Sequence, residues 1–86
     1  MLTMYSKSNC PACVSAKALL TSYGIDYQEI KIDEDQDAKQ FILSKNHRTV
    51  PQIYNGADIF VEGGYLGLKQ MSESQIKKLL YGDIML

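Results

Sequence analysis

The sequence of 86 residues predicts an α/β fold in which a four-stranded mixed sheet carries helices on both faces. Three observations predict this class. Two short stretches of alternating apolar and polar residues flank a helical stretch near the N-terminus, which is the pattern of a β-α-β unit. An Asn-Gly pair between two further short strands indicates a β-hairpin. A Ser-x-x-Gln sequence then opens a helix near the C-terminus, which gives the order β-α-β-α-β-β-α.

The first β-α-β unit spans residues 2–32. Residues 2–6 alternate as a short strand does, and Pro11 suits the first position of a helix, where its missing N–H costs nothing. The helix should run to about residue 22 and stop at Gly24. Its expected apolar face comprises Val14, Ala18 and Leu19, with Leu20 beside it. Residues 27–32 alternate again, and a right-handed crossover makes this strand parallel to the first.

Residues 33–37 form an acidic run, which is either a charged recognition patch or the cap of a second helix. Acids at a helix start complement its dipole, so the cap is favoured. The apolar side of that helix comprises Ala38, Phe41 and Ile42, and Asn46-His47-Arg48 closes it. A lone histidine at a helix end, His47, is expected to be structural rather than catalytic. Arg48 either lines a groove or follows the helix dipole.

The remaining elements begin at a third strand, residues 51–54. Asn55-Gly56 turns the chain into an antiparallel strand at 58–61, which Gly63-Gly64 ends. A helical segment follows at about 66–71. Residues 72–75 resemble a capping box that restarts a helix, which Gly82 ends and residues 83–86 follow as a loose tail. That helix is expected to bury Ile76, Leu79 and Leu80. Residues 1–86 thus form one domain with the thioredoxin-like arrangement.

Composition limits the classes of function. The formal net charge is −1, which does not favour a nucleic-acid partner, and no apolar run approaches the roughly 20 residues that span a bilayer. The first residues lack the pattern of a signal peptide, so we expect a cytoplasmic protein without a membrane partner. Thiols stay reduced there, which makes two cysteines catalytic or metal-binding rather than a structural staple. A structural zinc site needs four ligands, and Cys10, Cys13 and His47 are too few, so no metal is predicted.

Cys10 is the expected nucleophile. It falls at the start of the first helix, directly after a strand, where unpaired N–H groups and the helix dipole stabilise a thiolate. A cysteine so placed can have its pKa lowered from about 8.5 to roughly 3.5–7.5. Cys13 lies one helical turn further on, which lets the two sulfurs form a disulfide. Cys13 should be less exposed and should resolve a mixed disulfide formed on Cys10.

Three stretches resemble the signatures of dithiol glutaredoxins of the short bacterial or bacteriophage type. They are residues 5–13 (Tyr-Ser-Lys-Ser-Asn-Cys-Pro-Ala-Cys), residues 49–54 (Thr-Val-Pro-Gln-Ile-Tyr) and Gly63-Gly64. The resemblance implies a thiol–disulfide oxidoreductase that reduces protein disulfides and protein–glutathione mixed disulfides. It implies glutathione as co-substrate, no bound cofactor, and a monomer whose partners are disulfide-containing proteins such as ribonucleotide reductase.

The resemblance also implies a glutathione site. Pro51 would follow a cis peptide bond and face the cysteines, and the backbone of Val50 would pair with the cysteinyl part of glutathione. Lys7 would pair with the glycine carboxylate, and the helix start behind Gly64 would bind the γ-glutamyl carboxylate. The predicted glutathione-binding residues are Lys7, Thr49, Val50, Pro51, Gly64, Tyr65 and Leu66.

The sequence departs from the family pattern at three places. Ala12 stands where the family often has Tyr. Tyr65 and Leu66 follow the glycines where an Asp, Ser or Thr usually bonds the γ-glutamyl group, so Tyr65 either covers the ligand or is a surface aromatic. Ala38 stands near the family's polar contact on the second helix, with Lys39 and Gln40 as weak replacements.

Alternative functions remain open at this point. The missing polar residue near Leu66 leaves room for a glutaredoxin-like electron donor recharged by thioredoxin reductase. Thioredoxin itself is disfavoured because the chain has no Trp. A non-enzymatic iron–sulfur carrier is disfavoured by Pro11 in the middle of the cysteine motif, although Ala12 removes a bulky obstacle. A redox-silent binding module is the third alternative.

Overall fold

The computed structural model describes residues 1–82, and the tail expected at 83–86 lies outside the described residues. Its first four elements alternate strand and helix, and two consecutive strands and two helices follow. In chain order they are β1 (Leu2–Ser6), α1 (Pro11–Ser22), β2 (Tyr27–Lys31), α2 (Gln36–Ser44), β3 (Gln52–Asn55), β4 (Asp58–Val61), α3 (Gly64–Lys69) and α4 (Glu73–Tyr81).

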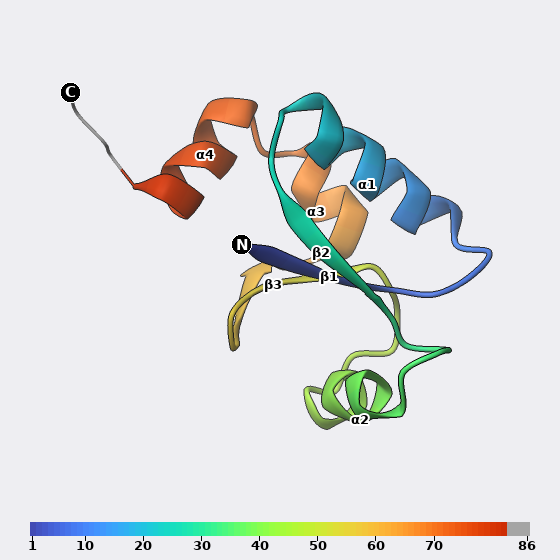
Figure 1. Ribbon diagram of the computed structural model, residues 1–86. Helices are drawn as coiled ribbons and strands as arrows, with labels where there is room; N and C mark the ends of the chain where they lie inside the picture. The colour runs from blue at the N-terminus through green and yellow to red at the C-terminus, as the bar shows by residue number, and fades with distance from the viewer. Residues whose placement is uncertain (83–86) are drawn as a thin grey trace.

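The four strands form one mixed sheet in the order β2-β1-β3-β4. Strand β1 pairs with β2 in parallel and with β3 antiparallel, and β3 pairs with β4 antiparallel. Helices α1 and α3 cover one face of the sheet and α2 covers the other (Figure 1). The α/β class and the thioredoxin-like arrangement are therefore confirmed, with the closing helical part divided into α3 and α4.

The aliphatic core lies between the sheet and helices α1, α3 and α4. Leu2 and Met4 of β1 point to this face and are fully buried. The other buried members of the cluster are Ala16, Leu20, Ile25, Ile53, Leu68 and Ile76. Because consecutive strand residues point to opposite faces, the same strand sends Tyr5 to the α2 face.

The α2 face is aromatic. The ring of Tyr5 lies 5.3 Å from that of Phe41 and 5.8 Å from that of Tyr54, measured between centroids. His47 completes the group through a hydrogen bond of 2.6 Å between its Nε2 and the Tyr54 hydroxyl. This contact packs His47 into the aromatic group, and its structural rather than catalytic role stays a prediction.

Two helix starts are capped as predicted. Asp35 accepts a hydrogen bond of 2.9 Å from the Ala38 N–H, so the acidic run does cap α2. Ser72 and Gln75 form a reciprocal capping box at the start of α4. Each cap satisfies amide groups that the first helical turn would otherwise leave unpaired.

The predicted apolar faces of α1 and α4 were partly wrong. Val14 is 60% exposed and Ala18 is exposed, because α1 buries the face that carries Cys13, Ala16 and Leu20. These three residues also follow helical spacing, and two of them are small enough to be overlooked as core. In the short helix α4, Ile76 and Leu80 turn to the core while Leu79 is 61% exposed.

Some boundaries shift by one or two residues. Strand β3 begins at Gln52, not Pro51, since proline has no N–H for the ladder. The hairpin turns at Gly56-Ala57, while Asn55 still pairs with Asp58. Helix α3 begins at Gly64, two residues before the expected start, with Gly63 in the left-handed region at its N-cap. None of these shifts changes the topology.

Candidate active site

Cys10 is the N-cap residue of α1. Its backbone is extended, Pro11 opens the helix behind it, and its Sγ accepts a hydrogen bond of 3.2 Å from the Cys13 N–H. The Cys10 carbonyl accepts the first helical bond, from the Val14 N–H, at 3.1 Å. The sulfur therefore lies where the positive end of the helix dipole and the Cys13 N–H both point.

Cys10 and Cys13 form a disulfide, with Cα atoms 5.2 Å apart. Cys13 is 2% exposed and Cys10 is 8% exposed. The predicted proximity of the two sulfurs and the deeper position of Cys13 are both confirmed. The roles of nucleophile and resolving thiol stay predictions.

The loop before Cys10 is held from the β2–α2 connection. The Ser8 N–H donates a hydrogen bond of 3.2 Å to Oδ2 of Asp33. Hydrogen bonding from Ser8 lowers the pKa of Asp33 below its ordinary value. Asn9, the next residue, has a φ of 56°, a left-handed conformation that asparagine tolerates better than most side chains. Asp33 and Asn9 thus fix the chain that delivers Cys10 to the helix start.

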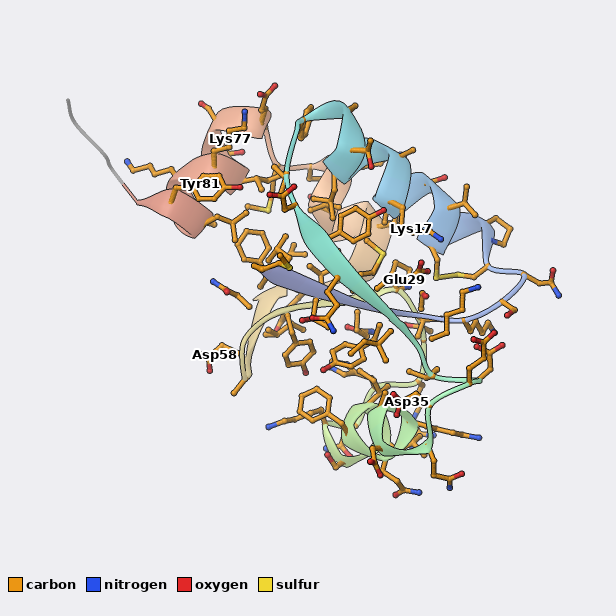
Figure 2. The ribbon with its side chains drawn as sticks, viewed as in Figure 1. Lys17, Glu29, Asp35, Asp58, Lys77 and Tyr81 are labelled. Carbon is orange, nitrogen blue, oxygen red and sulfur yellow. A yellow bond between two sulfur atoms is a disulfide. The ribbon has the colours of Figure 1, made fainter. Side chains whose placement is uncertain are left out.

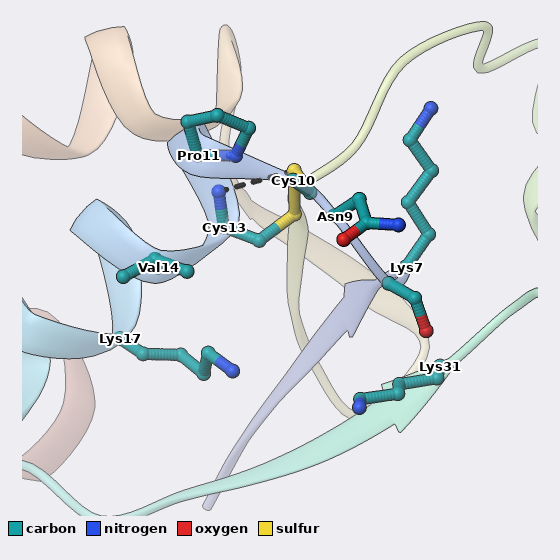
Figure 3. A pocket seen from close by; sticks show the side chains of 9 residues that line it. Lys7, Asn9, Cys10, Pro11, Cys13, Val14, Lys17 and Lys31 are labelled. Atoms are coloured by element: carbon teal, nitrogen blue, oxygen red, sulfur yellow. Dashed lines mark hydrogen bonds between the residues drawn. A yellow bond between two sulfur atoms is a disulfide. The ribbon is translucent and has the colours of Figure 1, made fainter.

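A pocket of 490 Å³ opens beside the disulfide, and we call it the lysine pocket (Figure 3). Three of its lining side chains are lysines, Lys7, Lys17 and Lys31, and none of the described residues that line it is acidic. The other lining residues are Ser8, Asn9, Cys10, Pro11, Cys13 and Val14. The Lys17 and Lys31 side chains reach toward the space below the disulfide from α1 and β2. A pocket so lined favours an anion next to the reactive sulfurs.

A second, smaller depression of 130 Å³ lies between α2 and the segment before β3, and we call it the Val50 groove. Its basic side chains include Lys7, Lys39 and Arg48. The remaining lining residues are Ile32, Ile42, Leu43, His47, Thr49 and Val50. Cys10 Sγ lies 3.8 Å from the Val50 carbonyl oxygen, so the groove meets the disulfide, and the Val50–Pro51 peptide bond is cis, as expected.

Gly64 has a structural reason to be glycine. Its φ is 59°, and a Cβ at this position would lie 2.7 Å from the Pro51 carbonyl oxygen. The start of α3 therefore packs directly against the segment that carries the cis peptide bond. A side chain at position 64 would separate these two segments.

The structure brings only part of the predicted glutathione site together. Lys7, Thr49 and Val50 line one groove, and Pro51 and Gly64 lie in contact behind it. Tyr65 packs against the aliphatic core, with the Lys69 ammonium 5.7 Å from its ring centroid, and Leu66 is 63% exposed. Of the residues that sequence reasoning left open, Arg48 and Lys39 line the groove, while Gln40 does not.

Sequence reasoning missed a polar cluster beneath the cysteines, formed by Ser6, Glu29 and Lys17. The Ser6 hydroxyl, fully buried, donates a hydrogen bond of 2.6 Å to Glu29, and the Lys17 ammonium lies 2.9 Å from the same carboxylate oxygen. The bond from Ser6 and the charge of Lys17 lower the pKa of Glu29. One sequence signal existed: Lys17 follows Cys13 by four residues and so lies on the same side of α1.

Residues 1–82 lack the arrangements that two other kinds of site would need, a metal centre and a membrane-spanning helix. No three histidine, cysteine, aspartate or glutamate side chains in this range come together as a metal centre would need. No helix in this range is long and apolar enough to cross a membrane.

Comparison with known proteins gives consistent results. The Glutaredoxin family model matches residues 2–60. Glutaredoxin 3 of Escherichia coli strain K12 is 42% identical over 52 residues, which are 59% of this chain and 63% of that protein, so the match spans less than two thirds of this relative. Glutaredoxin 1 of Rickettsia felis is 34% identical over 86 residues, which cover 95% of this chain and 82% of that protein.

A solved structure extends the comparison to three dimensions. The crystal structure of a buckwheat glutaredoxin–glutathione complex has a TM-score of 0.66 and 25% sequence identity, and the match covers 94% of this chain and 70% of that one.

Proposed function

This chain belongs to the glutaredoxin family, and on that premise we propose that it is a glutathione-dependent thiol–disulfide oxidoreductase in which Cys10 is the nucleophile. The single observation that carries the proposal is the position of Cys10: its Sγ caps α1, accepts the Cys13 N–H and is bonded to Cys13. Amide groups at a helix start favour a thiolate, which is the reactive form of cysteine.

The monothiol route needs Cys10 alone. The Cys10 thiolate attacks the glutathione sulfur of a protein–glutathione mixed disulfide, so a Cys10–glutathione disulfide forms and the protein thiolate leaves and takes up a proton. A second glutathione thiolate then attacks the glutathione sulfur bound to Cys10. This step releases glutathione disulfide and restores the Cys10 thiolate, so the net reaction converts the mixed disulfide and one free glutathione into the protein thiol and glutathione disulfide.

The dithiol route uses both cysteines. The Cys10 thiolate attacks a protein disulfide, and one substrate sulfur leaves as a thiolate. Cys13 then loses its proton and attacks Cys10 Sγ, which forms the Cys10–Cys13 disulfide and releases the second substrate thiol. Two glutathiones return this disulfide to the dithiol and become glutathione disulfide. The Cα separation of 5.2 Å suits the bond that this cycle forms and breaks.

Glutathione is proposed to lie in the Val50 groove. Its cysteinyl part would pair with the Val50 backbone, whose carbonyl oxygen is 3.8 Å from Cys10 Sγ. Its glycine carboxylate would meet Lys7, with Lys39 and Arg48 on the same groove wall. The γ-glutamyl end would extend past Pro51 toward Gly64, Tyr65 and Leu66. The relative solved as a glutathione complex supports this ligand. We further propose a cytoplasmic monomer that acts on disulfide-containing proteins.

Turnover of a glutathionylated peptide, with glutathione and glutathione reductase as the recycling system, tests the proposal. Cys10→Ser should abolish activity, because serine cannot form the mixed disulfide. Cys13→Ser should keep the monothiol reduction of this substrate and lose the reduction of an intramolecular peptide disulfide. Retention of activity in Cys10→Ser, or loss of both activities in Cys13→Ser, would refute the assigned roles.

A second reductant has one observation in its favour. Leu66, exposed and apolar, stands where a polar γ-glutamyl contact was expected, and neither the lysine pocket nor the Val50 groove includes the start of α3. This favours recharging by thioredoxin reductase. The same peptide assay with thioredoxin reductase in place of glutathione and its reductase separates the two reductants, because only one of them should sustain turnover.

A further inference from the structure

We propose that the lysine pocket selects disulfide substrates that carry an acidic segment next to the reacting cysteine. This inference rests on the proposed function and names a class of protein substrate for it. The occupant is a segment of the substrate protein, which lies in the pocket while its sulfur meets Cys10.

The first argument is the uneven placement of charge. The whole chain has a formal net charge of −1, yet three of its nine Lys and Arg residues line this one pocket beside the disulfide. Neighbouring acids reduce this positive charge without cancelling it. Glu29 pairs with Lys17, and both Glu29 and Asp33 lie in the field of Lys31. Three cations against two anions leave the pocket positive.

The second argument is that the three lysines have different contacts. Lys17 is held by its ion pair of 2.9 Å with Glu29, and Lys7 also lines the Val50 groove, where glutathione is proposed to bind. Lys31 lines the lysine pocket but not the Val50 groove, and none of the ion pairs found among residues 1–82 involves it. Lys31 is therefore the cation with the greatest freedom to meet a substrate carboxylate.

The third argument is the shape and polarity of the entrance. Val14 is 60% exposed and Pro11 is exposed, so an apolar rim adjoins the cations and the disulfide. A volume of 490 Å³ accommodates side chains of an extended segment. Together these features fit a segment in which acidic and apolar residues flank a cysteine, since charged groups at a rim steer a partner and fix its register.

The test uses two peptides with one intramolecular disulfide each, identical except that two glutamates beside one cysteine are glutamines in the second. The full chain, reduced beforehand and freed of glutathione, is mixed with each peptide, and the second-order rate constant of peptide reduction is measured. The wild type should reduce the acidic peptide faster. Lys31→Gln should lower the acidic-to-neutral ratio about two- to fivefold, as expected for one partly exposed charge pair.

Controls separate a local charge contact from the net charge. Lys77→Gln makes the same charge change on α4, away from the disulfide (Figure 2), and should keep the wild-type ratio. Lys31→Arg should restore the ratio because it restores the cation. Added salt should bring the ratio of the wild type toward one. Thermal unfolding of each variant checks that the fold is intact.

Each unfavourable outcome has a distinct meaning. Equal rates for the two peptides, or an equal fall for both in Lys31→Gln, would overturn the inference while the proposed function stands. A rise in the KM for glutathione in Lys31→Gln with an unchanged peptide ratio would also overturn it, because the carboxylate in the pocket would then belong to glutathione. Failure of the reduced wild type to reduce either peptide would instead refute the proposed function.

Discussion

The two faces of the sheet are held together by different chemistry. On the α1 and α3 face, aliphatic side chains such as Leu2, Met4 and Leu20 are fully buried. On the α2 face, the rings of Tyr5, Phe41 and Tyr54 meet one another, and a hydrogen bond joins His47 to the group. The first face is held mainly by the non-directional burial of aliphatic side chains, whereas the second depends on ring orientation and on one polar bond.

This difference matches the position of the candidate site. The aliphatic face supports α1, which carries both cysteines, and it ends at the polar cluster of Ser6, Glu29 and Lys17. The aromatic face supports the wall of the Val50 groove through His47. We therefore expect the aliphatic face to contribute most of the folding free energy, and the aromatic face to set the shape of the groove.

Leu20→Ala should break the aliphatic face. Leu20 is fully buried between α1 and the sheet, and truncating such a leucine leaves a cavity, so the free energy of unfolding should fall by about 3 kcal/mol. Leu79→Ala, which removes the same atoms from a side chain that is 61% exposed, should cost less than about 0.5 kcal/mol. Urea unfolding of both variants measures the difference, and equal losses would contradict the proposed core.

Glu29→Gln should weaken the polar cluster of Ser6, Glu29 and Lys17 at the end of the aliphatic face. The folded pKa of Glu29 lies below its ordinary value of 4.5, so the ionised form stabilises the fold, and this stabilisation is lost as pH falls from 4.5 through the folded pKa. Near neutral pH the variant should lose about 1 to 2 kcal/mol, because the buried Ser6 hydroxyl loses a charged acceptor.

Unfolding measured at several pH values tests that expectation. The difference between wild type and Glu29→Gln should shrink as the pH is lowered below 4.5. The variant Glu62→Gln removes the charge of an exposed glutamate and should show little loss at any pH. A difference that does not change with pH would show that packing, not ionisation, accounts for the effect.

Tyr54→Phe should have the smallest effect and should isolate the polar bond of the aromatic face. The ring stays in place while the hydrogen bond to His47 is lost, so we expect a loss of about 1 kcal/mol. A double-mutant cycle with His47→Ala measures the coupling directly. Tyr81→Phe, at a tyrosine that is 50% exposed, is the matched control, and a loss there equal to that of Tyr54→Phe would contradict the assignment.

The sequence predicted most of the fold because its local signals are strong. Three signals each predict a single local structure, and the structure agrees with all of them. They are the strand pattern of residues 2–6, Pro11 at a helix start and the capping box at Ser72. Val14 and Leu79 were misplaced because a short helix can offer two apolar faces. Only the tertiary packing decides which face is buried.

The candidate site was predictable where it depends on neighbours in the chain. Cys10 caps the start of α1 and Cys13 lies three residues further on, in its first turn, so their proximity follows from spacing alone. The lysine pocket combines Lys7, Lys17 and Lys31 from three different elements. No local pattern in the sequence shows that these lysines converge, and the same is true of the contact between Gly64 and Pro51.

The dual position of Cys10 has a practical consequence. The Cys10 sulfur both caps the N-terminus of α1 and exchanges bonds with substrates. The amide of Cys13 therefore has a hydrogen-bond acceptor whose charge changes during the reaction cycle. The magnetic environment of that amide must follow the oxidation state of its neighbour. A single backbone resonance can therefore report turnover in real time, without any dye or fused sensor.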